Sequence, residues 1–170
     1  MASLVDELIN VLSEEEKLYC DLEECADAKT QILVQADIAA LEKLTAIEQE
    51  KSDELLALGN KQVQILNDIK TVLGRNDERL TVTTLIGYLA SQEEAQEKLT
   101  IARDNLISAA KRVQDKNRQN VVLLNHAIEM TEFDITLFKS MRQAPATANY
   151  DKNAYNTGAL LGTSGFDAKQ

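Results

Sequence analysis

The sequence predicts an all-α fold: an elongated antiparallel helical bundle or coiled coil with one very long C-terminal helix and a flexible tail. Three observations favour this fold class. The 170 residues include no Trp, one Pro and six Gly, which are too few turn-forming residues for an all-β fold. Apolar residues recur every three or four positions over long segments. With 44% hydrophobic and 27% charged residues, the chain is apolar enough to form one ordinary domain with a core.

Two long helices are predicted in the first part of the chain, at about residues 2–35 and 38–73. The stripe of the first contains Leu4, Leu8, Val11, Leu18, Leu22, Cys25 and Ile32, with Glu15 in the one missing place. The stripe of the second passes through Ile38, Leu41, Leu44, Leu55, Leu66, Ile69 and Leu73. Asp37 is the expected N-cap of the second helix, and Gly74 is the glycine expected to end it.

A short helix and a very long one are predicted next, at about residues 82–90 and 92–142. The segment TVTTLIGYLA is rich in β-branched residues, but a lone strand among helices would have nothing to pair with. Ser91 and Glu94 have the spacing of a capping box that would open the long helix. Its stripe contains Leu99, Ala102, Leu106, Ala110, Val113, Asn117, Val121, Leu124, Ile128, Thr131, Ile135 and Phe138. Such a helix would be roughly 75 Å long.

The last part of the chain is predicted to differ from the helical domain, which we place at residues 1–143. Residues 144–170 contain the only proline, three of the six glycines and no sustained period, which is typical of a flexible tail. An inert solubilising tail is one interpretation. The other is a short linear motif that docks on another protein or covers a groove, for which the candidate residues are Tyr150, Tyr155, Gly158, Leu160 and Leu161.

The charge distribution narrows the classes of partner. Residues 1–73 carry 16 Asp and Glu against 6 Lys and Arg, which accounts for the whole net charge of −10. This acidic segment would repel nucleic acid and anionic lipid, so we expect neither as a partner. The N-terminus lacks the pattern of a secretory signal, and no apolar run approaches the roughly 20 residues of a membrane span. We therefore expect a cytoplasmic protein without membrane insertion.

Catalytic and metal sites have little support in the sequence. There is one histidine, His126, and the chain has no Gly-rich phosphate loop, no GxSxG and no HExxH. A di-iron bundle would need Glu-x-x-His, but Leu123 lies three positions before His126. Cys20 and Cys25 are five residues apart, which is not the spacing of a redox motif. We expect no catalytic residue, no metal and no cofactor; an enzyme or metalloprotein is the least favoured interpretation.

The stretch KNRQNVVLLNHAIEM places asparagines in the most apolar part of the long helix. Asn117 takes a stripe position and Asn120 lies beside the stripe, where a buried amide must find a matched hydrogen bond. One interpretation is that the amides set the register between the protein's own helices. The other is that they bind a partner helix in a groove, for which the candidate residues are Asn117, Asn120, Val121, Leu124, Ile128, Thr131, Ile135 and Phe138.

With these residues the chain resembles the FlgN-like flagellar export chaperones over nearly its full length. The resemblance rests on Asn117-x-x-Asn120 followed by Leu123, Leu124, Ala127, Ile128, Ile135 and Leu137. It extends to an acidic N-terminal helix with Leu18-Tyr19, to Leu41 and Leu44 followed by Glu48, and to Tyr155 and Gly158 in the tail.

The resemblance implies a chaperone that binds the C-terminal segments of hook-filament junction proteins and delivers them to the flagellar export gate. Such segments are amphipathic helices whose apolar stripes would aggregate if left unassembled, and a groove could bury them. The alternative is a self-associating coiled-coil protein, in which a homodimer buries the same stripe of the long helix.

Overall fold

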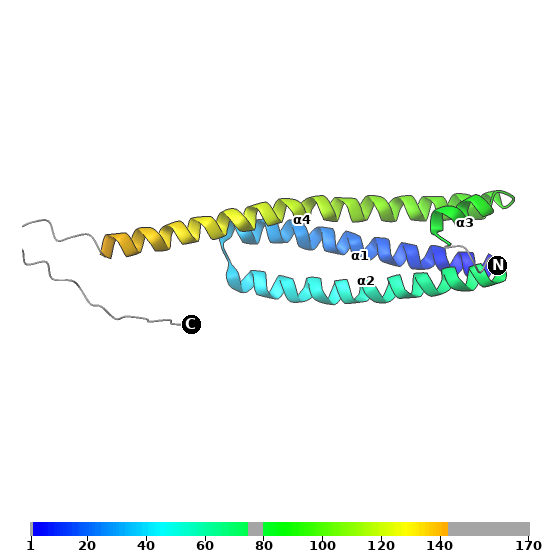
Figure 1. The fold of residues 1–170 in the computed structure, drawn as a ribbon, viewed down its shortest axis with the longest axis horizontal. Helices are drawn as coiled ribbons and strands as arrows, with labels where there is room; N and C mark the ends of the chain where they lie inside the picture. Colours follow the sequence, from blue (N-terminus) through cyan, green and yellow to red (C-terminus); the bar gives the residue numbers. More distant parts are fainter. Residues whose placement is uncertain (1, 75–79, 143–170) are drawn as a thin grey trace, which may run out of the picture. The chain divides into compact units, whose positions relative to one another are not determined.

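The structure is a computed structural model that describes residues 2–74 and 80–142. These residues form four helices: α1 (Ala2–Gln35), α2 (Ile38–Val72), α3 (Val82–Tyr88) and α4 (Glu93–Arg142), as Figure 1 shows. No strand occurs in the described residues. The predicted all-α fold with one very long final helix is therefore confirmed.

The chain divides into two structural units, Met1–Leu124 and Asn125–Gln170, with the division inside α4. The first unit contains α1, α2, α3 and the first part of α4. The described part of the second unit is the remainder of α4, residues 125–142. The domain boundary predicted near residue 143 stays a prediction, because residues 143–170 lie outside the described residues.

A two-residue turn reverses the chain between α1 and α2. Ala36 has a φ of 54°, and the amides of Ala36 and Asp37 donate to the carbonyls of Leu33 and Ile32, which satisfies two carbonyls of the last turn of α1. The carboxylate of Asp37 accepts from the amide of Ala40 at 3.0 Å, which confirms Asp37 as the N-cap of α2. This turn explains why α1 and α2 run antiparallel.

Capping residues account for the end of α2 and the start of α3, whereas the start of α4 differs from the prediction. Gly74, with a φ of 69°, follows the C-cap of α2, as expected of a helix-terminating glycine. Thr81 and Thr84 form the capping box of α3. The capping box predicted for Ser91 is wrong, because α4 begins one residue later than that motif requires and Glu94 accepts instead from Lys98.

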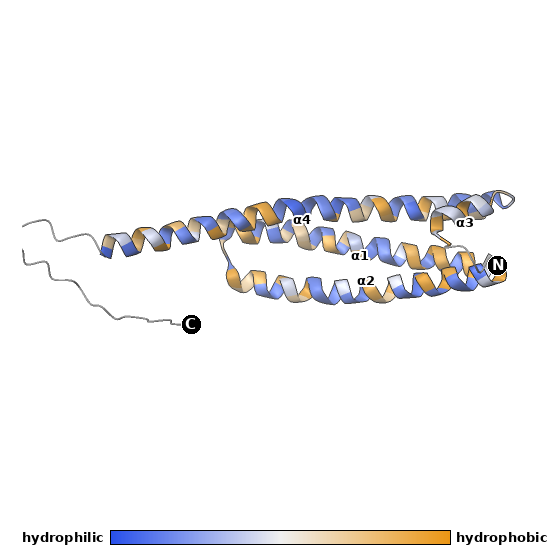
Figure 2. Ribbon diagram, in the orientation of Figure 1, coloured by the Kyte–Doolittle hydropathy of each residue, from blue (hydrophilic) through white to orange (hydrophobic). Residues whose placement is uncertain are grey.

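The apolar core of the first unit lies at one end of the bundle. It joins the N-terminal half of α1, the C-terminal half of α2, the short α3 and the beginning of α4, and Figure 2 shows the hydrophobic residues of α1 and α3 at this end. Its buried members are Val5, Leu8, Val11, Leu12, Ile65, Ile69, Leu85, Leu89, Leu99 and Ala102. Burial of several large aliphatic side chains, each worth about 1.5–3 kcal/mol, stabilises this end of the unit.

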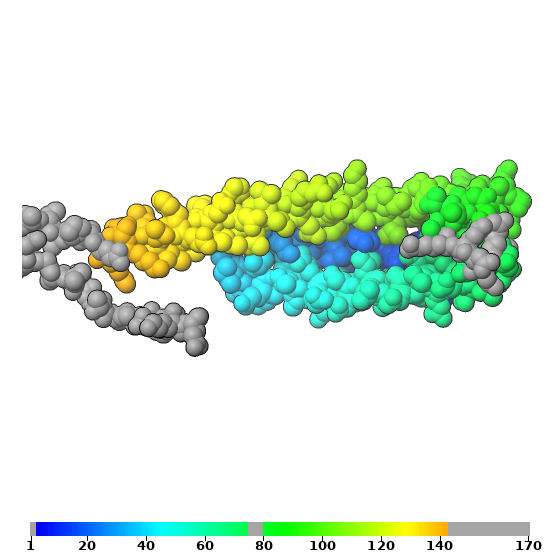
Figure 3. Space-filling view, in the orientation of Figure 1, coloured from blue at the N-terminus to red at the C-terminus, as the bar shows by residue number. Residues whose placement is uncertain are grey.

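Beyond this core, toward the turn between α1 and α2, fewer side chains are fully buried. Cys25, Ala26, Leu33 and Val113 are buried there, but polar contacts between the helices are frequent. Within the first unit, α1 is visible between α2 and α4 in the space-filling view of Figure 3. Among the described helices, none is both long enough and apolar enough to cross a membrane.

Candidate functional site

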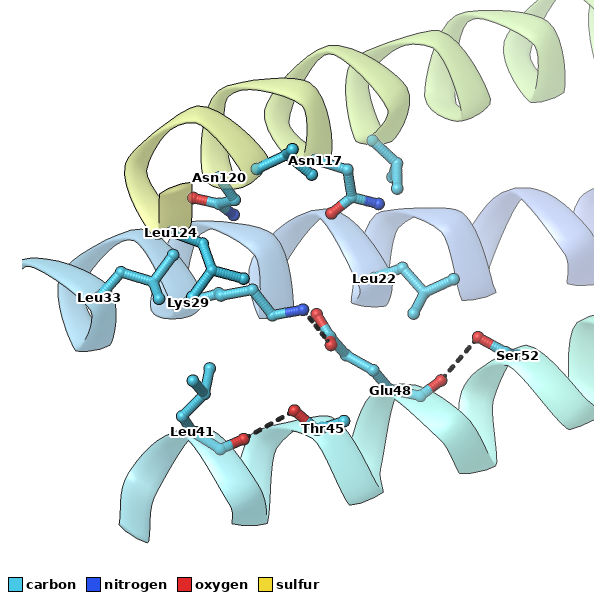
Figure 4. A pocket seen from close by; sticks show the side chains of 12 residues that line it. Leu22, Lys29, Leu33, Leu41, Thr45, Glu48, Ser52, Asn117, Asn120 and Leu124 are labelled. Carbon is cyan, nitrogen blue, oxygen red and sulfur yellow. Dashed lines mark hydrogen bonds and ion pairs between the residues drawn. The ribbon is translucent and has the colours of Figure 1, made fainter. Parts of the chain in front are cut away.

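A cavity of about 370 Å³ lies within the first unit, between α1, α2 and α4 (Figure 4). Its wall combines aliphatic and polar side chains from all three helices: Leu22, Lys29, Leu33, Leu41, Thr45, Glu48, Ser52, Val113, Asn117, Asn120, Val121 and Leu124. Four of these residues, Asn117, Asn120, Val121 and Leu124, are among the candidates predicted from the sequence. A cavity with apolar walls and a few polar groups is the usual form of a binding site.

Asn120 connects α4 to α1 and is only 3% exposed. Its amide nitrogen donates to the carbonyl of Ala26 at 2.7 Å, and its amide oxygen accepts from the hydroxyl of Thr30 at 2.7 Å. Both ends of the amide are therefore satisfied inside the protein, as a buried polar group requires. This geometry favours the interpretation in which Asn120 sets the register between the protein's own helices.

Asn117 has a different environment although it lies only one turn away. Its side chain is exposed and lines the cavity, and it forms no hydrogen bond with any part of the chain that the structure describes. Val121 and Leu124 are also substantially exposed on the same wall. An unoccupied amide beside two exposed aliphatic side chains can receive both a polar and an apolar group of a partner.

An ion pair between Lys29 on α1 and Glu48 on α2 forms another part of the wall (Figure 4). Each of the two side chains is about one-fifth exposed, so water screens the ion pair only in part. Sequence reasoning did not identify Lys29 as part of this site. Its partner lies 19 residues away on another helix, and no local spacing reveals such a pair.

Basic residues of α4 neutralise part of the acidic surface of α1. Glu23 accepts from Arg112 at 2.8 Å and lies 3.2 Å from the ammonium group of Lys116, which also pairs with Asp27. The hydrogen bond from Arg112, supported by Lys116, holds the pKa of Glu23 below its ordinary value of 4.5. The acidic helix therefore contributes to the attachment of α4 as well as to a solvated surface.

Glu15 occupies an apolar position of α1 and is 5% exposed. A Cβ added to Gly59 of α2 would lie 3.9 Å from its Oε1, an ordinary contact distance, so Gly59 lies beside the carboxyl. No ion pair or hydrogen bond of Glu15 is found among the described residues. Burial therefore raises its pKa above 4.5, because water that would stabilise the charge is excluded.

The other four candidates on α4 belong to the second unit. Ile128, Thr131, Ile135 and Phe138 are all exposed, and at their spacing they lie on one face of the helix. The hydroxyl of Thr131 donates to the carbonyl of Ala127 within its own helix. This segment therefore presents an apolar face to solvent. The tail candidates Tyr150, Tyr155, Gly158, Leu160 and Leu161 lie outside the described residues.

One family matches the chain. Residues 1–158 match the family described as FlgN protein. Compared with the curated proteins and with the solved structures, the chain gives no significant match. Because the family match spans most of the sequence and the fold is the helical one that the resemblance implied, the chain belongs to the FlgN family of flagellar export chaperones.

Proposed function

We propose that this protein acts in the cytoplasm by binding the C-terminal amphipathic helices of hook-filament junction proteins, preventing their premature aggregation and delivering them to the flagellar export gate. The observation that carries the proposal is the cavity wall formed by Asn117, Val121 and Leu124, which is apolar, exposed and equipped with an unpaired amide. Family membership supports the chaperone class but does not name the cargo.

Helix-in-groove packing is the binding mode that this wall supports best. The apolar stripe of a cargo helix would contact aliphatic side chains from three helices, while the amide of Asn117 would pair with a polar group of the cargo. Asn120 would act indirectly, because it holds α4 against α1 and so maintains the wall. The exposed face of the second unit, with Ile128, Ile135 and Phe138, supplies a further apolar surface for cargo.

Calorimetry with a synthetic peptide from the C-terminal end of a junction protein tests the proposal. The double substitution Asn117→Ala with Leu124→Asp removes the amide and places a charge on the cavity wall, so affinity should fall by at least about tenfold. Val63→Asp is the matched control, because Val63 is an exposed aliphatic residue of α2 that does not line the cavity. Equal affinity of both variants and the original chain would exclude this site.

Self-association through α4 is the competing function, since the same exposed residues could be buried against a second copy. Light scattering distinguishes self-association from binding of a cargo peptide. A dimer that persists unchanged when the junction peptide is added would favour self-assembly, whereas a monomer that forms a one-to-one complex favours the chaperone.

The tail is proposed to dock on the export gate, with Tyr150, Tyr155, Gly158, Leu160 and Leu161 as the docking residues. Deletion of residues 144–170 should then reduce secretion of the junction protein in cells and leave the affinity for the junction peptide unchanged. Tighter binding of the peptide after the deletion would instead identify the tail as a lid over the cargo site.

A further inference from the structure

The second unit carries an apolar stripe in addition to the face described above. Met130, Phe133, Leu137 and Met141 are all exposed, at 69%, 66%, 46% and 66%. Their spacing of three or four residues places them on one line along α4. We call these four residues the second stripe, and we call the line through Ile128, Thr131 and Ile135 the first stripe.

The two stripes lie on opposite sides of the helix. Met130, Phe133 and Leu137 each follow a first-stripe residue by two positions, and two positions of an α-helix correspond to a rotation of about 200°. A single partner helix packed against the first stripe therefore leaves the second stripe in water. A helix that is apolar on two opposite sides needs two partners to bury both.

The charges beside the second stripe indicate what kind of partner fits. Glu129 lies on one flank, about 40° around the helix from Phe133, and Asp134 lies on the other, about 40° from Met130. The basic residues of this segment, Lys139 and Arg142, fall on the side of the first stripe. Among the described residues, His126 also lies near the second stripe, and its Nδ1 is 3.6 Å from Glu129. The flanks of the second stripe are thus acidic.

We propose that the second stripe is a docking surface for another protein: an amphipathic helix whose apolar stripe is flanked by Lys or Arg. Apolar contacts would supply affinity, and basic flanks would pair with Glu129 and Asp134. A second copy of this chain fits less well, because two second stripes packed together would bring acidic flanks against acidic flanks. This partner is distinct from the cargo, so the inference goes beyond the proposed function.

Titration of the full chain with a designed helix tests the inference. The probe is a synthetic peptide of about three heptads with Leu at the core positions and Lys at the flanking positions. A matched peptide carries Glu in place of Lys. The variant Phe133→Ser with Leu137→Ser disables the second stripe, and Ile128→Ser with Ile135→Ser makes the same kind of change on the first. All four residues are exposed, so circular dichroism should show unchanged folding.

The second-stripe substitutions should weaken binding of the Lys-flanked peptide by at least about tenfold. The first-stripe substitutions should weaken it less, because Glu129 and Asp134 flank the second stripe. Glu129→Gln with Asp134→Asn should also weaken binding and reduce its dependence on salt.

Equal binding of the Lys- and Glu-flanked peptides would overturn the inference. An equal loss of affinity in the two Ser variants would overturn it as well. A dimer of the original chain that only the second-stripe variant dissociates would assign the surface to a second copy. None of these measurements uses the junction peptide, so their failure leaves the proposed function untouched.

Discussion

The side-chain amide of Asn120 on α4 donates a hydrogen bond of 2.7 Å to the backbone carbonyl of Ala26 on α1, 94 residues earlier in the chain. This bond, together with the hydroxyl of Thr30, fixes where α4 lies along α1. Since a one-turn shift of α4 would leave the amide buried without partners, the pair specifies one register.

Asn120→Ala should lower the free energy of unfolding by about 1–3 kcal/mol, because it removes both hydrogen bonds of a buried amide. Urea denaturation measures the effect. Asn117→Ala is the matched control, since the exposed Asn117 amide has no partner among the described residues, and it should change stability by less than about 0.5 kcal/mol. Equal destabilisation by the two substitutions would contradict the assignment of the buried amide as the register device.

Glu15→Gln should stabilise the protein more as the pH rises. The folded-state pKa of Glu15 is raised above 4.5, so its protonation favours folding at low pH, and this contribution is lost as the pH rises through the folded-state value. Glutamine cannot ionise and avoids that loss. Urea denaturation of both proteins over a pH series measures the difference, with Glu14→Gln on the exposed side of α1 as the control. A difference that is constant with pH would show that Glu15 is hydrated in the folded protein.

Glu23→Gln should destabilise the protein at neutral pH, with the opposite pH dependence. The folded-state pKa of Glu23 is lowered by Arg112 and Lys116, so its contribution is present above 4.5 and disappears as the pH falls through the folded-state value. The stability difference should therefore shrink in acid, and it should also shrink at high salt. Glu94→Gln is the control, because Glu94 pairs with Lys98 inside one helix and joins no two helices.

Gly59→Ala should raise the free energy of unfolding by about 0.5–1 kcal/mol, because glycine in a helix interior loses more backbone entropy on folding than alanine does. A Cβ at this position meets Glu15 only at an ordinary contact distance of 3.9 Å. Gly59→Leu should instead destabilise, since its longer side chain must displace the Glu15 carboxyl. Thermal unfolding measures both variants, and stabilisation by leucine as well would show that the space beside Glu15 is larger than this contact indicates.

The helices could be predicted from the sequence because their signals are local. A repeat of three and four residues defines the apolar stripe of each long helix, and the caps at Asp37 and Gly74 depend on neighbouring residues alone. The burial of the two asparagines could not be predicted from local sequence. Asn117 and Asn120 are three residues apart and have the same chemistry, yet one is exposed and the other is buried.

The partners of the site residues could not be predicted in the same way. The amide of Asn120 binds a backbone carbonyl, and every residue has one, so the sequence contains no sign of Ala26 as the acceptor. The cavity residues of α1 and α2, such as Leu22, Lys29 and Ser52, come together only through the packing of three helices. The candidate residues of α4 fall in both units, because the chain divides after Leu124.

The uneven packing of the first unit has a consequence for amide hydrogen exchange. Leu8, Ile69 and Leu85 are held in the apolar core at one end, while the end beside Ala26 and Glu48 depends on a buried amide and ion pairs. Local opening should therefore need less free energy at the second end, and its amides should exchange first. Under the proposed function, such a partial opening would admit and release a cargo helix while the remainder of the unit stays folded.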